Sequence, residues 1–503
     1  MLIKLLIQVG LAALLVGCTV QPAPIMQAEV ERRVENDLWL LKMTENPVTG
    51  PISIHEAMAR ALAYNLDLNL ERYKSNLIET QFELSRFDQL PKLVADHTSD
   101  GRSNFSGGAS RSLLTGAQSL ESSTSSDRYA QRDDLGLSWN ILDFGVSYFR
   151  AKQAANRVLL AEEQQRNVVN RILSDVQKAY WQAVSFQRLI KQLELLMHKV
   201  QLKLSDSRAI GTQGLDTPLS ALIYQRELIN NTRELYQLYE GLTQAKVELA
   251  FLMNVSMHQS FELVAYDKPD EAPPLPFELD IMETIALENR SELMEVGYQK
   301  RINSHEIKAT YVGMLPGIDL NYGRNYNSNS FLFNADWSNY SARISWNLLN
   351  LFRYPAAKRL AEAQTDTLDA QRLALSAVVL TQIHVGAARF QHSLSEYQIA
   401  SDLHATQTKI LSQIQRAVEV ESTSEQVLIR EEMNALLAEV RYDIAYANLE
   451  GALTDLYFAM GLNPTLNELD ASDLATLTRS LKAYFETQKN ITHRNPSPNN
   501  KLP

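Results

Sequence analysis

Apolar residues recur at helical spacing through the long stretch from Asn140 to Val255. In its first half they fall at heptad positions, with further apolar residues between them: Val169, Val176, Ala183 and Ile190, joined by Leu173 and Tyr180. No proline lies between Asn140 and Thr217, so nothing forces a kink there. An arm of roughly 60 residues is about 90 Å long, too long for one compact core. The stretch therefore predicts two long antiparallel helices, joined by a turn from Gly211 to Pro218, in a coiled bundle or tube.

The same helical hairpin occurs twice in the chain. Trp139-Asn140 precedes the first copy and Trp346-Asn347 precedes the second, while Phe251 near the end of the first is matched by Phe458. The offset is the same at both ends, since 346 − 139 = 207 and 458 − 251 = 207. Equal offsets mean equal lengths, so the sequence indicates two fused copies of one unit.

A shorter helix is predicted ahead of each copy. Ser53 and Glu56 have the spacing of a capping box, which opens a helix, and Pro91 ends that helix after Leu90. The stretch from Leu275 to Leu315 repeats the pattern and ends at Pro316. We therefore expect one continuous helix at the start of each copy.

Between each Leu-Pro pair and each Trp-Asn pair, the pattern changes to the alternation of β-strands. One face of the strand before the first long helix carries Leu135, Leu137, Trp139 and Ile141, and the other carries Gly136, Ser138 and Asn140. The second copy alternates in two runs: Ile318, Leu320 and Tyr322, then Tyr340, Ala342, Ile344 and Trp346. Each copy is therefore predicted to contribute a two-stranded hairpin with one apolar and one polar face.

The amino terminus is typical of a secretory signal, with one lysine followed by an apolar run up to Val16. Leu15-Val16-Gly17-Cys18 resembles the bacterial lipobox, whose cysteine becomes the first mature residue and carries a covalent lipid. The alternative is a buried thiol that follows an apolar run by chance. Thr19 stands where an aspartate would indicate inner-membrane retention, so the resemblance favours the outer membrane. After the leader, we expect no window with the roughly 18 apolar residues of a membrane helix.

These features divide the chain into six segments. The linker between the copies is the clearest internal boundary, because four prolines lie between Lys268 and Pro276. The expected segments are a signal peptide (1–17), a lipidated tether (18–51), a first repeat (52–265), a proline-rich linker (266–276), a second repeat (277–465) and a C-terminal segment with a disordered end (466–503).

Composition and motifs argue against several classes of function. The formal net charge of −11 lacks the basic face that a general nucleic-acid binder needs. His384 and His392 are about 12 Å apart along a helix, too far to share one metal ion. No glycine-rich phosphate loop, GxSxG elbow or HExxH motif occurs, and adjacent acids such as Glu431-Glu432 are interpreted as solvated faces. We therefore expect no enzyme activity, no metal and no cofactor other than the lipid on Cys18.

The strands leave two interpretations open. Alternating faces with aromatic residues near the strand ends are typical of a membrane barrel. Four strands cannot close one, because bacterial barrels need about eight or more, so copies of the chain would have to associate. The alternative is a soluble β-meander that caps a helical bundle. The residues expected in an aromatic belt are Trp139, Phe144, Trp346 and Phe352.

The order lipobox, helix, Leu-Pro, strand hairpin, Trp-Asn and long helical hairpin, with the last five steps present twice, resembles the TolC family of outer-membrane channel-tunnels, in its lipidated branch. The resemblance covers about Ser53 to Pro464 and implies a mainly α fold with a small β part. It implies that three chains form one transmembrane barrel of twelve strands, four from each, and a helical tunnel that extends into the periplasm. It also implies a periplasmic adaptor protein and an inner-membrane pump as partners.

The turns between the long helices are expected at the periplasmic tip. In the first, Gly211 and Gly214 end one helix, Asp216 lies in the turn, and Thr217 and Pro218 start the next helix. In the second, Val418 and Glu421 replace the two glycines, and Ser422 and Glu425 have capping-box spacing with Thr423 between them. The acids there are either solvated charges or rings that narrow a three-fold channel. The candidate gate residues are Arg416, Glu419, Glu421 and Glu425.

The leading hypothesis is a passive exit duct of an efflux or export system, gated at its periplasmic tip and lipid-anchored in the outer membrane of a bacterium. A lipid-anchored periplasmic coiled-coil scaffold without a pore is the main alternative. A third possibility is the outer-membrane component of a type I protein secretion system. An apolar outer band on the strands favours the two ducts, because a scaffold has no use for one.

Overall fold

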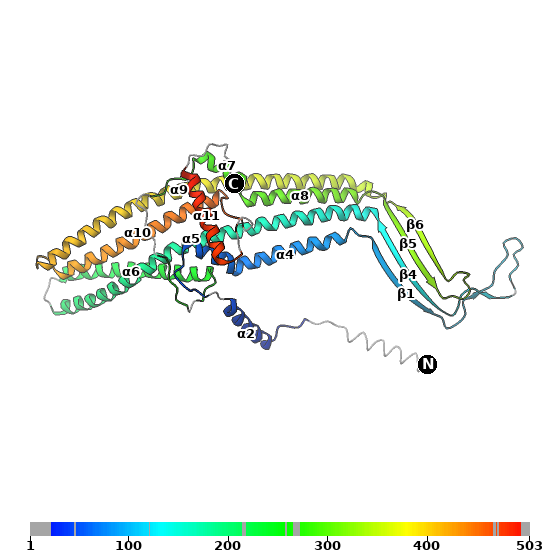
Figure 1. The fold of residues 1–503 in the computed structure, drawn as a ribbon, viewed down its shortest axis with the longest axis horizontal. Coiled ribbons are helices and arrows are strands. Elements are labelled where there is room, and N and C mark those ends of the chain that lie inside the picture. The colour runs from blue at the N-terminus through cyan, green and yellow to red at the C-terminus, as the bar shows by residue number, and fades with distance from the viewer. Residues whose placement is uncertain are drawn as a thin grey trace.

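The computed structural model describes residues 22–44, 47–119, 121–213, 218–256, 259–264, 272–465, 469 and 472–493. The chain forms an elongated strip with two helical hairpins at one end, helices lying side by side in the middle and strands at the other end (Figure 1). The predicted signal peptide, Cys18, and the turn residues Gly214, Asp216 and Thr217 lie outside the described residues.

The two long helical hairpins are confirmed. The first consists of α5 (Ile141–Gln213, 73 residues) and α6 (Pro218–Leu252, 35 residues). The second consists of α9 (Asn350–Glu419, 70 residues) and α10 (Glu425–Ala459, 35 residues). The returning helices keep the offset found in the sequence, since 425 − 218 = 207 and 459 − 252 = 207.

The returning helices also end in the same way. Asn254 (φ 51°) and Gly461 (φ 72°) both take the left-handed conformation, and they are equivalent positions because 461 − 254 = 207. In each case, the next amide donates back into the last turn, from Val255 to Ala250 (2.9 Å) and from Leu462 to Tyr457 (3.1 Å). This is a Schellman cap, which glycine and asparagine tolerate best. The duplication therefore extends to the backbone conformation of single residues.

The expectation of one continuous helix ahead of each copy was wrong. The first is divided into α3 (Ile54–Tyr64) and α4 (Leu66–Phe87), and the second into α7 (Leu279–Asn289) and α8 (Ser291–Val312). Asn65 causes the first break because its side chain caps α4, accepting hydrogen bonds from the amides of Asp67 (3.0 Å) and Leu68 (3.2 Å). Its amide group also donates to the carbonyl of Leu252 (3.2 Å), which fixes the break against the end of α6.

The cap at Ser53 is present but differs from a full capping box. The Ser53 hydroxyl accepts from the amide of Glu56 (3.2 Å), as expected. The Glu56 carboxylate pairs with Arg60 (2.9 Å) along the same helix.

The two predicted strand hairpins are confirmed and join into one sheet. Its strands are β1 (Lys92–Gly101), β4 (Tyr129–Asn140), β5 (Gly317–Asn327) and β6 (Asp336–Ser345), paired antiparallel in the order β1-β4-β5-β6. β4 and β5 connect the two copies, with Trp139 opposite Leu320. The connection between β1 and β4 contains a further short pair, β2 (Gly107–Gly108) and β3 (Ser123–Thr124).

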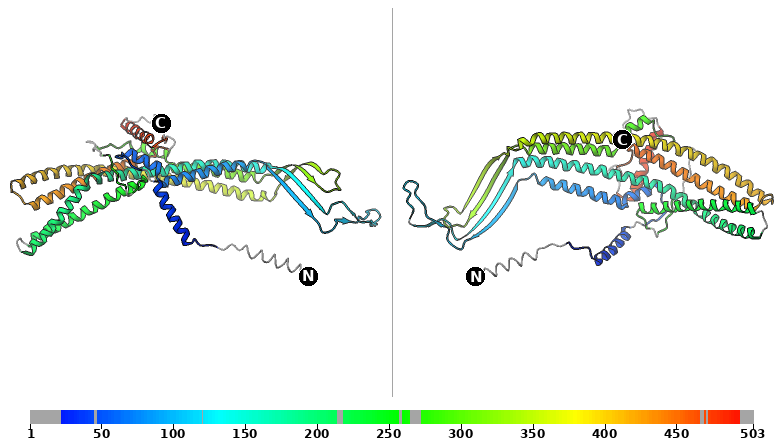
Figure 2. Two further views of the ribbon diagram at one scale, coloured as in Figure 1. Left: turned by 60° about the horizontal axis from the view of Figure 1, so that its bottom comes forward. Right: turned by 180° about the vertical axis from the view of Figure 1, so that it is seen from behind.

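The largest core lies at the middle of the strip, where α3, α5 and α10 meet α11 (Leu474–His493). Ile52 forms a parallel bridge with Leu263, and the buried Tyr180 hydroxyl donates to the Ile52 carbonyl (3.1 Å). Burial raises the pKa of Tyr180 to about 12, so the hydroxyl stays a donor. α2 (Gln27–Thr44), within the expected tether, projects from this region, as Figure 2 shows from two sides.

One long helix departs from the expected hydropathy. Within the described residues, α9 alone is long and apolar enough to cross a membrane by length and composition, and 17 % of its qualifying window is buried. The expectation that no such window follows the leader was wrong, because α9 is apolar on two faces. Val379 and Ile383 are buried against α7 and α10, while Val378 and Val385 are half-exposed.

Candidate functional site

The two central strands of the sheet, β4 and β5, expose their apolar side chains, whereas β1 and β6 are exposed at every position. Along β4, Leu135, Leu137 and Trp139 are exposed, whereas Gly136 and Ser138 between them are partly covered. A soluble half-buried sheet shows the opposite pattern, with its apolar side chains covered and its polar side chains in water. The inverted alternation is typical of strands that face lipid on one side and an aqueous lumen on the other.

The apolar positions of the four strands lie in register. Leu93, Leu137, Tyr322 and Tyr340 are directly opposite one another across the sheet, and Trp139, Leu320 and Ala342 form the next row. The alternate row on the other face is polar, with Lys92, Ser138, Asn321 and Ser341 in register. One face of the sheet therefore carries an apolar band over these two rows. In the next row toward the loops, Ala95 and Leu135 are apolar but Arg324 and Ser338 are polar.

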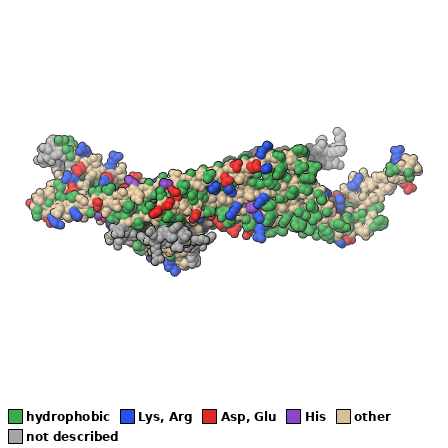
Figure 3. All heavy atoms as spheres, turned by 90° about the horizontal axis from the view of Figure 1, so that it is seen from above, with side chains coloured by type: hydrophobic (Ala, Val, Ile, Leu, Met, Phe, Trp, Pro, Cys, Tyr) green, Lys and Arg blue, Asp and Glu red, His purple; other side chains and the backbone are tan. Residues whose placement is uncertain are grey.

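The four predicted belt residues lie where the strands join the helices. Trp139 packs edge-on against Phe144 (5.8 Å between ring centroids) in the first copy. In the second, the Trp346 indole donates to the carbonyl of Met314 (3.0 Å), and Phe352 is 81 % exposed. Figure 3 shows hydrophobic side chains gathered over this junction on the α9 side.

Both long edges of the strip are open in the single chain. β1 and β6 are the outer strands of the described sheet and each pairs on one side only. The helical part also forms an open layer. Toward the tips the order of neighbouring helices is α6, α5, α10, α9, and toward the sheet it is α4, α5, α8, α9. Apolar side chains are exposed along these outer helices: Leu70, Tyr73, Leu77 and Leu84 on α4, Leu222, Ile229 and Tyr236 on α6, and Leu360, Leu373, Ile399 and Leu403 on α9. The strip therefore lacks a partner along both edges.

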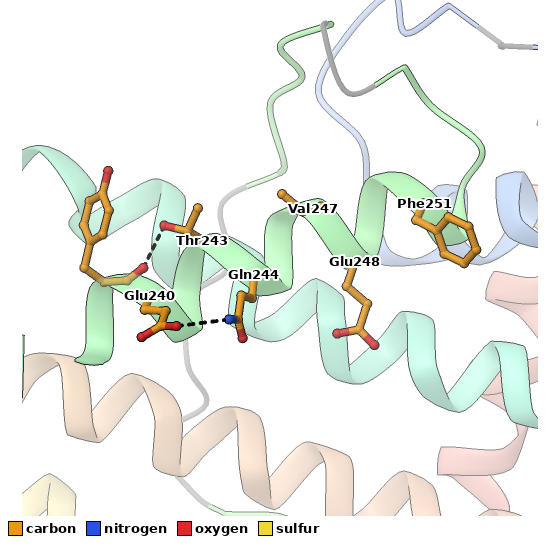
Figure 4. Close-up of a pocket in the computed structure, with 7 residues that line it drawn as sticks. Glu240, Thr243, Gln244, Val247, Glu248 and Phe251 are labelled. Carbon is orange, nitrogen blue, oxygen red and sulfur yellow. Dashed lines mark hydrogen bonds between the residues drawn. The ribbon is translucent and has the colours of Figure 1, made fainter. Parts of the chain in front are cut away.

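A shallow apolar groove on α6 is part of the same open edge. It has a volume of about 660 Å³ and is lined by residues between Tyr239 and Phe251. Two of its polar side chains bond along their own helix, from Thr243 to the carbonyl of Tyr239 (2.7 Å) and from Gln244 to Glu240 (3.5 Å) (Figure 4). Because its surface is mainly apolar, we assign the groove to the packing edge.

The second helical turn differs from its predicted form. The prediction of a capping box formed by Ser422 and Glu425 was wrong. Ser424 caps α10 instead, because its hydroxyl oxygen accepts a hydrogen bond from the amide of Val427 (3.4 Å). Ser422 instead closes a Schellman cap on α9, with its amide bonded to the carbonyl of Ala417 (2.9 Å). Glu421 occupies the left-handed position (φ 55°) that glycine usually fills. Glu421 is the equivalent of Gly214 in the sequence of the first turn, since 421 − 214 = 207.

Glu421→Gly is therefore expected to stabilise this turn. A left-handed residue with a Cβ costs roughly 1–2 kcal/mol, and a carboxylate at a helix C-terminus adds unfavourable dipole energy. Hydrogen exchange of the amides of Glu421 and Ser422 should slow about five-fold. Glu419→Gly lies inside the last turn of α9 and should speed exchange; slowing in both variants would contradict the assignment to the left-handed residue.

The other tip residues are only partly brought together. α5 continues through Gly211 to Gln213, so Gly211 does not end the helix, and α6 begins at Pro218 as expected. Arg416 and Glu419 lie in the last turn of α9, while Glu425 is the first residue of α10. Among the described side chains, no ion pair joins Arg416 to an acid of this turn. The proposed partnership of Arg416 thus has no support in the single chain.

Ion pairs instead link the two hairpins well above the tips. The Arg188 guanidinium on α5 binds both carboxylate oxygens of Asp443 on α10, with one bond of 3.1 Å from Nε, and it lies 3.5 Å from Glu439. Asp443 is only 3 % exposed. Lys199 pairs with Glu432 (3.1 Å) nearer the tips, and Arg441, two residues before Asp443, pairs with Glu234 on α6. Sequence reasoning missed these pairs and interpreted Glu432 as solvated; the available signal was a carboxylate at position 443 among core residues such as Val440 and Ala447.

A second polar cluster lies between α5 and α8. Asn167 donates to Glu295 (2.6 Å), and Arg166 donates to the carbonyl of Gly461 (3.1 Å). Burial raises the pKa of Glu295 and of the neighbouring Glu163. These contacts fasten α5 of the first copy to the second copy. Among the described residues, no group of acids, histidines or cysteines is arranged to hold a metal ion.

No protein-family model and no curated protein matches the chain. Solved structures do. A membrane protein from Pseudomonas aeruginosa superposes with a TM-score of 0.61 at 16 % identity, covering 81 % of this chain and 90 % of that chain. The open MtrE outer membrane channel of Neisseria gonorrhoeae superposes with a TM-score of 0.58 at 16 % identity, covering 81 % of this chain and 88 % of that chain. The CmeC outer membrane channel of Campylobacter jejuni superposes with a TM-score of 0.60 at 13 % identity, covering 87 % of this chain and 89 % of that chain. The chain therefore has the fold of these outer-membrane channels, which is the fold that its resemblance to the TolC family predicted.

Proposed function

We propose that three copies of the chain close edge to edge into an outer-membrane channel, a passive duct from the periplasm to the exterior. The apolar band on the exposed face of the sheet carries this proposal. Such a face is stable only against lipid, and an open four-stranded sheet cannot stand in lipid with two unpaired edges. Pairing β1 of one copy with β6 of the next preserves the antiparallel order and removes every edge.

The helical edges support the same assembly. Closure would place α9 of one copy beside α4 and α6 of the next, so the exposed leucines of these helices would cover one another. α5 has 73 residues and would extend about 110 Å, enough to continue the barrel far into the periplasm. A scaffold without a pore would leave the apolar band in water.

The anchor and the partners complete the proposal. Cys18 would carry a lipid in the outer membrane, and the tether up to Ile52 would join it to the core in the middle of the strip. Since no nucleotide-binding motif is present in the sequence, the energy for transport would come from an inner-membrane pump, contacted through a periplasmic adaptor at the helical tips.

Gating would occur where the hairpins converge. Inward acids repeated by three-fold symmetry form a ring that narrows a channel and selects cations. Glu419 and Glu421 are the described acids of the second turn, and both side chains are solvent-facing. Packed helices can switch between two arrangements, so small rotations of the hairpins would open the tip.

Single-channel conductance in planar bilayers tests this gate. The double variant Glu419→Gln/Glu421→Gln is expected to raise the conductance and lower the preference for cations. A matched control is Glu194→Gln, an exposed acid 19 residues before the end of α5, which is expected to leave both unchanged. Unchanged conductance in the double variant would remove these acids from the gate but leave the duct intact.

A further inference from the structure

The connection between β1 and β4 forms an ordered projection, here called the finger (Arg102–Arg128). Apart from position 120, its residues are described. Hydrogen bonds hold it along its length: Arg102 to Arg128 at the root (2.9 Å), Thr124 to the carbonyl of Ser106 in the middle (2.8 Å), and Ser112 to Ala117 near the apex (2.8 Å). The corresponding connection in the second copy, residues 328–335, is much shorter. The finger is thus a built element with a fixed apex.

The root of the finger is held by the shorter loop of the same chain. The Asp127 carboxylate accepts from the amide and the hydroxyl of Ser330 (2.5 and 2.9 Å), and the side chain of Asn329 donates to the carbonyl of Ser125 (3.0 Å). These contacts join two loops about 200 residues apart in sequence and set the direction in which the finger leaves the sheet.

The apex carries two adjacent leucines in open solvent. Leu113 is 103 % and Leu114 98 % exposed, in a turn closed by Gly116 (φ 70°) and by a bond from Arg111 to the Gly116 carbonyl (2.9 Å). Phe333 of the shorter loop is also fully exposed, so it does not cover them within one chain. A composition rich in serine and glycine surrounds these leucines, which makes the apex an isolated apolar contact surface.

Lipid does not cover this apex. Tyr129, at the root, lies ten residues before the belt residue Trp139 along β4, which is about 25 Å along the axis of a barrel whose strands tilt by about 40°. The apolar band of such barrels is only about 25 Å tall between its two aromatic girdles. The finger therefore begins outside the hydrocarbon layer, and its leucines lie beyond it.

A second and a third copy of the chain are within reach. This step rests on the proposed trimer. A barrel of twelve strands has a radius of about 12 Å, whereas an arm of the finger can extend about 40 Å. Figures 2 and 3 show the finger and the α5–α6 hairpin bending to the same side of the strip. If the hairpins converge on the three-fold axis at one end, the fingers converge on it at the other.

We propose that the three finger apices pack against one another through Leu113 and Leu114 over the extracellular mouth of the channel. Six leucines would then form a small apolar cluster on the symmetry axis, and the partner of each apex is the same apex of the other two copies. The cluster lies on the exit path, so cargo leaving the duct would have to separate the fingers.

Cysteine cross-linking tests the proposal in the full-length protein in its membrane. Leu114→Cys and, separately, Leu113→Cys introduce one thiol at the apex. A mild oxidant should then link two chains of each trimer, because three thiols at one axis can form one disulfide. The expected product is a covalent dimer containing up to about two-thirds of the chains.

Three comparisons make the result decisive. The unmodified chain, whose only cysteine is Cys18, and a Phe333→Cys variant should give no dimer. A trimer that remains intact by lysine cross-linking but gives no apical disulfide with either thiol would overturn the proposal, as would a dimer formed only when Leu114→Cys and Phe333→Cys are combined. Absence of the trimer itself would instead refute the proposed function.

Discussion

Tyr340→Arg is expected to prevent the chain from assembling in the outer membrane. Tyr340 lies on the apolar face, opposite Tyr322 and between Ala342 and Ser338 on the same face of β6, and is 87 % exposed. An arginine facing lipid costs about 2–4 kcal/mol at the middle of a barrel and less toward its ends, and every copy in the assembly incurs the cost. The amount of heat-resistant oligomer in outer-membrane fractions should fall at least ten-fold, since about 1.4 kcal/mol already corresponds to a factor of ten.

The adjacent residue provides the matched control. Ser341 follows Tyr340 in β6 and faces the other side of the sheet, in a polar row with Asn321. Ser341→Arg introduces the same side chain on the same strand and should leave the amount of oligomer nearly unchanged, because that face would line the aqueous lumen. Equal losses in both variants would contradict the assignment of the Tyr340 face to lipid and of the Ser341 face to an aqueous lumen.

Arg188→Ala is expected to loosen the contact between the two helical hairpins. The substitution leaves the buried Asp443 carboxylate without its guanidinium partner. Removing one member of a buried ion pair costs about 3–5 kcal/mol; because Arg188 is half-exposed, we expect about 2–3 kcal/mol. The thermal midpoint, followed by circular dichroism at 222 nm, should fall accordingly.

Arg441→Ala is the control that removes a positive charge from an exposed ion pair between the same two hairpins instead of from a buried one. Arg441 pairs with Glu234 across the same two hairpins, but both partners are substantially exposed, at 50 % and 34 %. Exposed pairs contribute about 0–1 kcal/mol, so its midpoint should hardly change. A drop as large as that of Arg188→Ala would mean that the contact depends on net charge between the hairpins rather than on the buried pair.

The main architecture could be predicted because long-range order in this fold follows from local periodicity. Heptad spacing without prolines specifies α5, and strict alternation around Leu137 specifies β4. The 207-residue offset then transfers each assignment to the second copy, where it holds even at Asn254 and Gly461. A continuous pattern over many residues outweighs weak local signals, so element types and order were recovered well.

The predictions that were wrong or missing concern features that depend on single side chains, several of which contact residues far away in sequence. Asn65 divides a helix because it also bonds to Leu252, a partner 187 residues away. Glu421 adopts a left-handed conformation that its residue type disfavours, so capping chemistry placed the turn two residues early. Arg188 and Asp443 are 255 residues apart. The spacing of Asp443 from Val440 and Ala447 indicates a buried carboxylate but does not say that its partner lies on α5. The tip and the contacts between hairpins were therefore the least predictable parts of the site.

The central claim is that several copies of this strip close into one pore. The most direct measurement is the native mass of the complex extracted in mild detergent, followed by its conductance in a planar bilayer. We predict a complex of three chains that remains whole after the lipid on Cys18 is removed and that gives discrete ion-conducting steps. A single chain released by delipidation, with no current, would contradict the channel and favour a lipid-anchored scaffold.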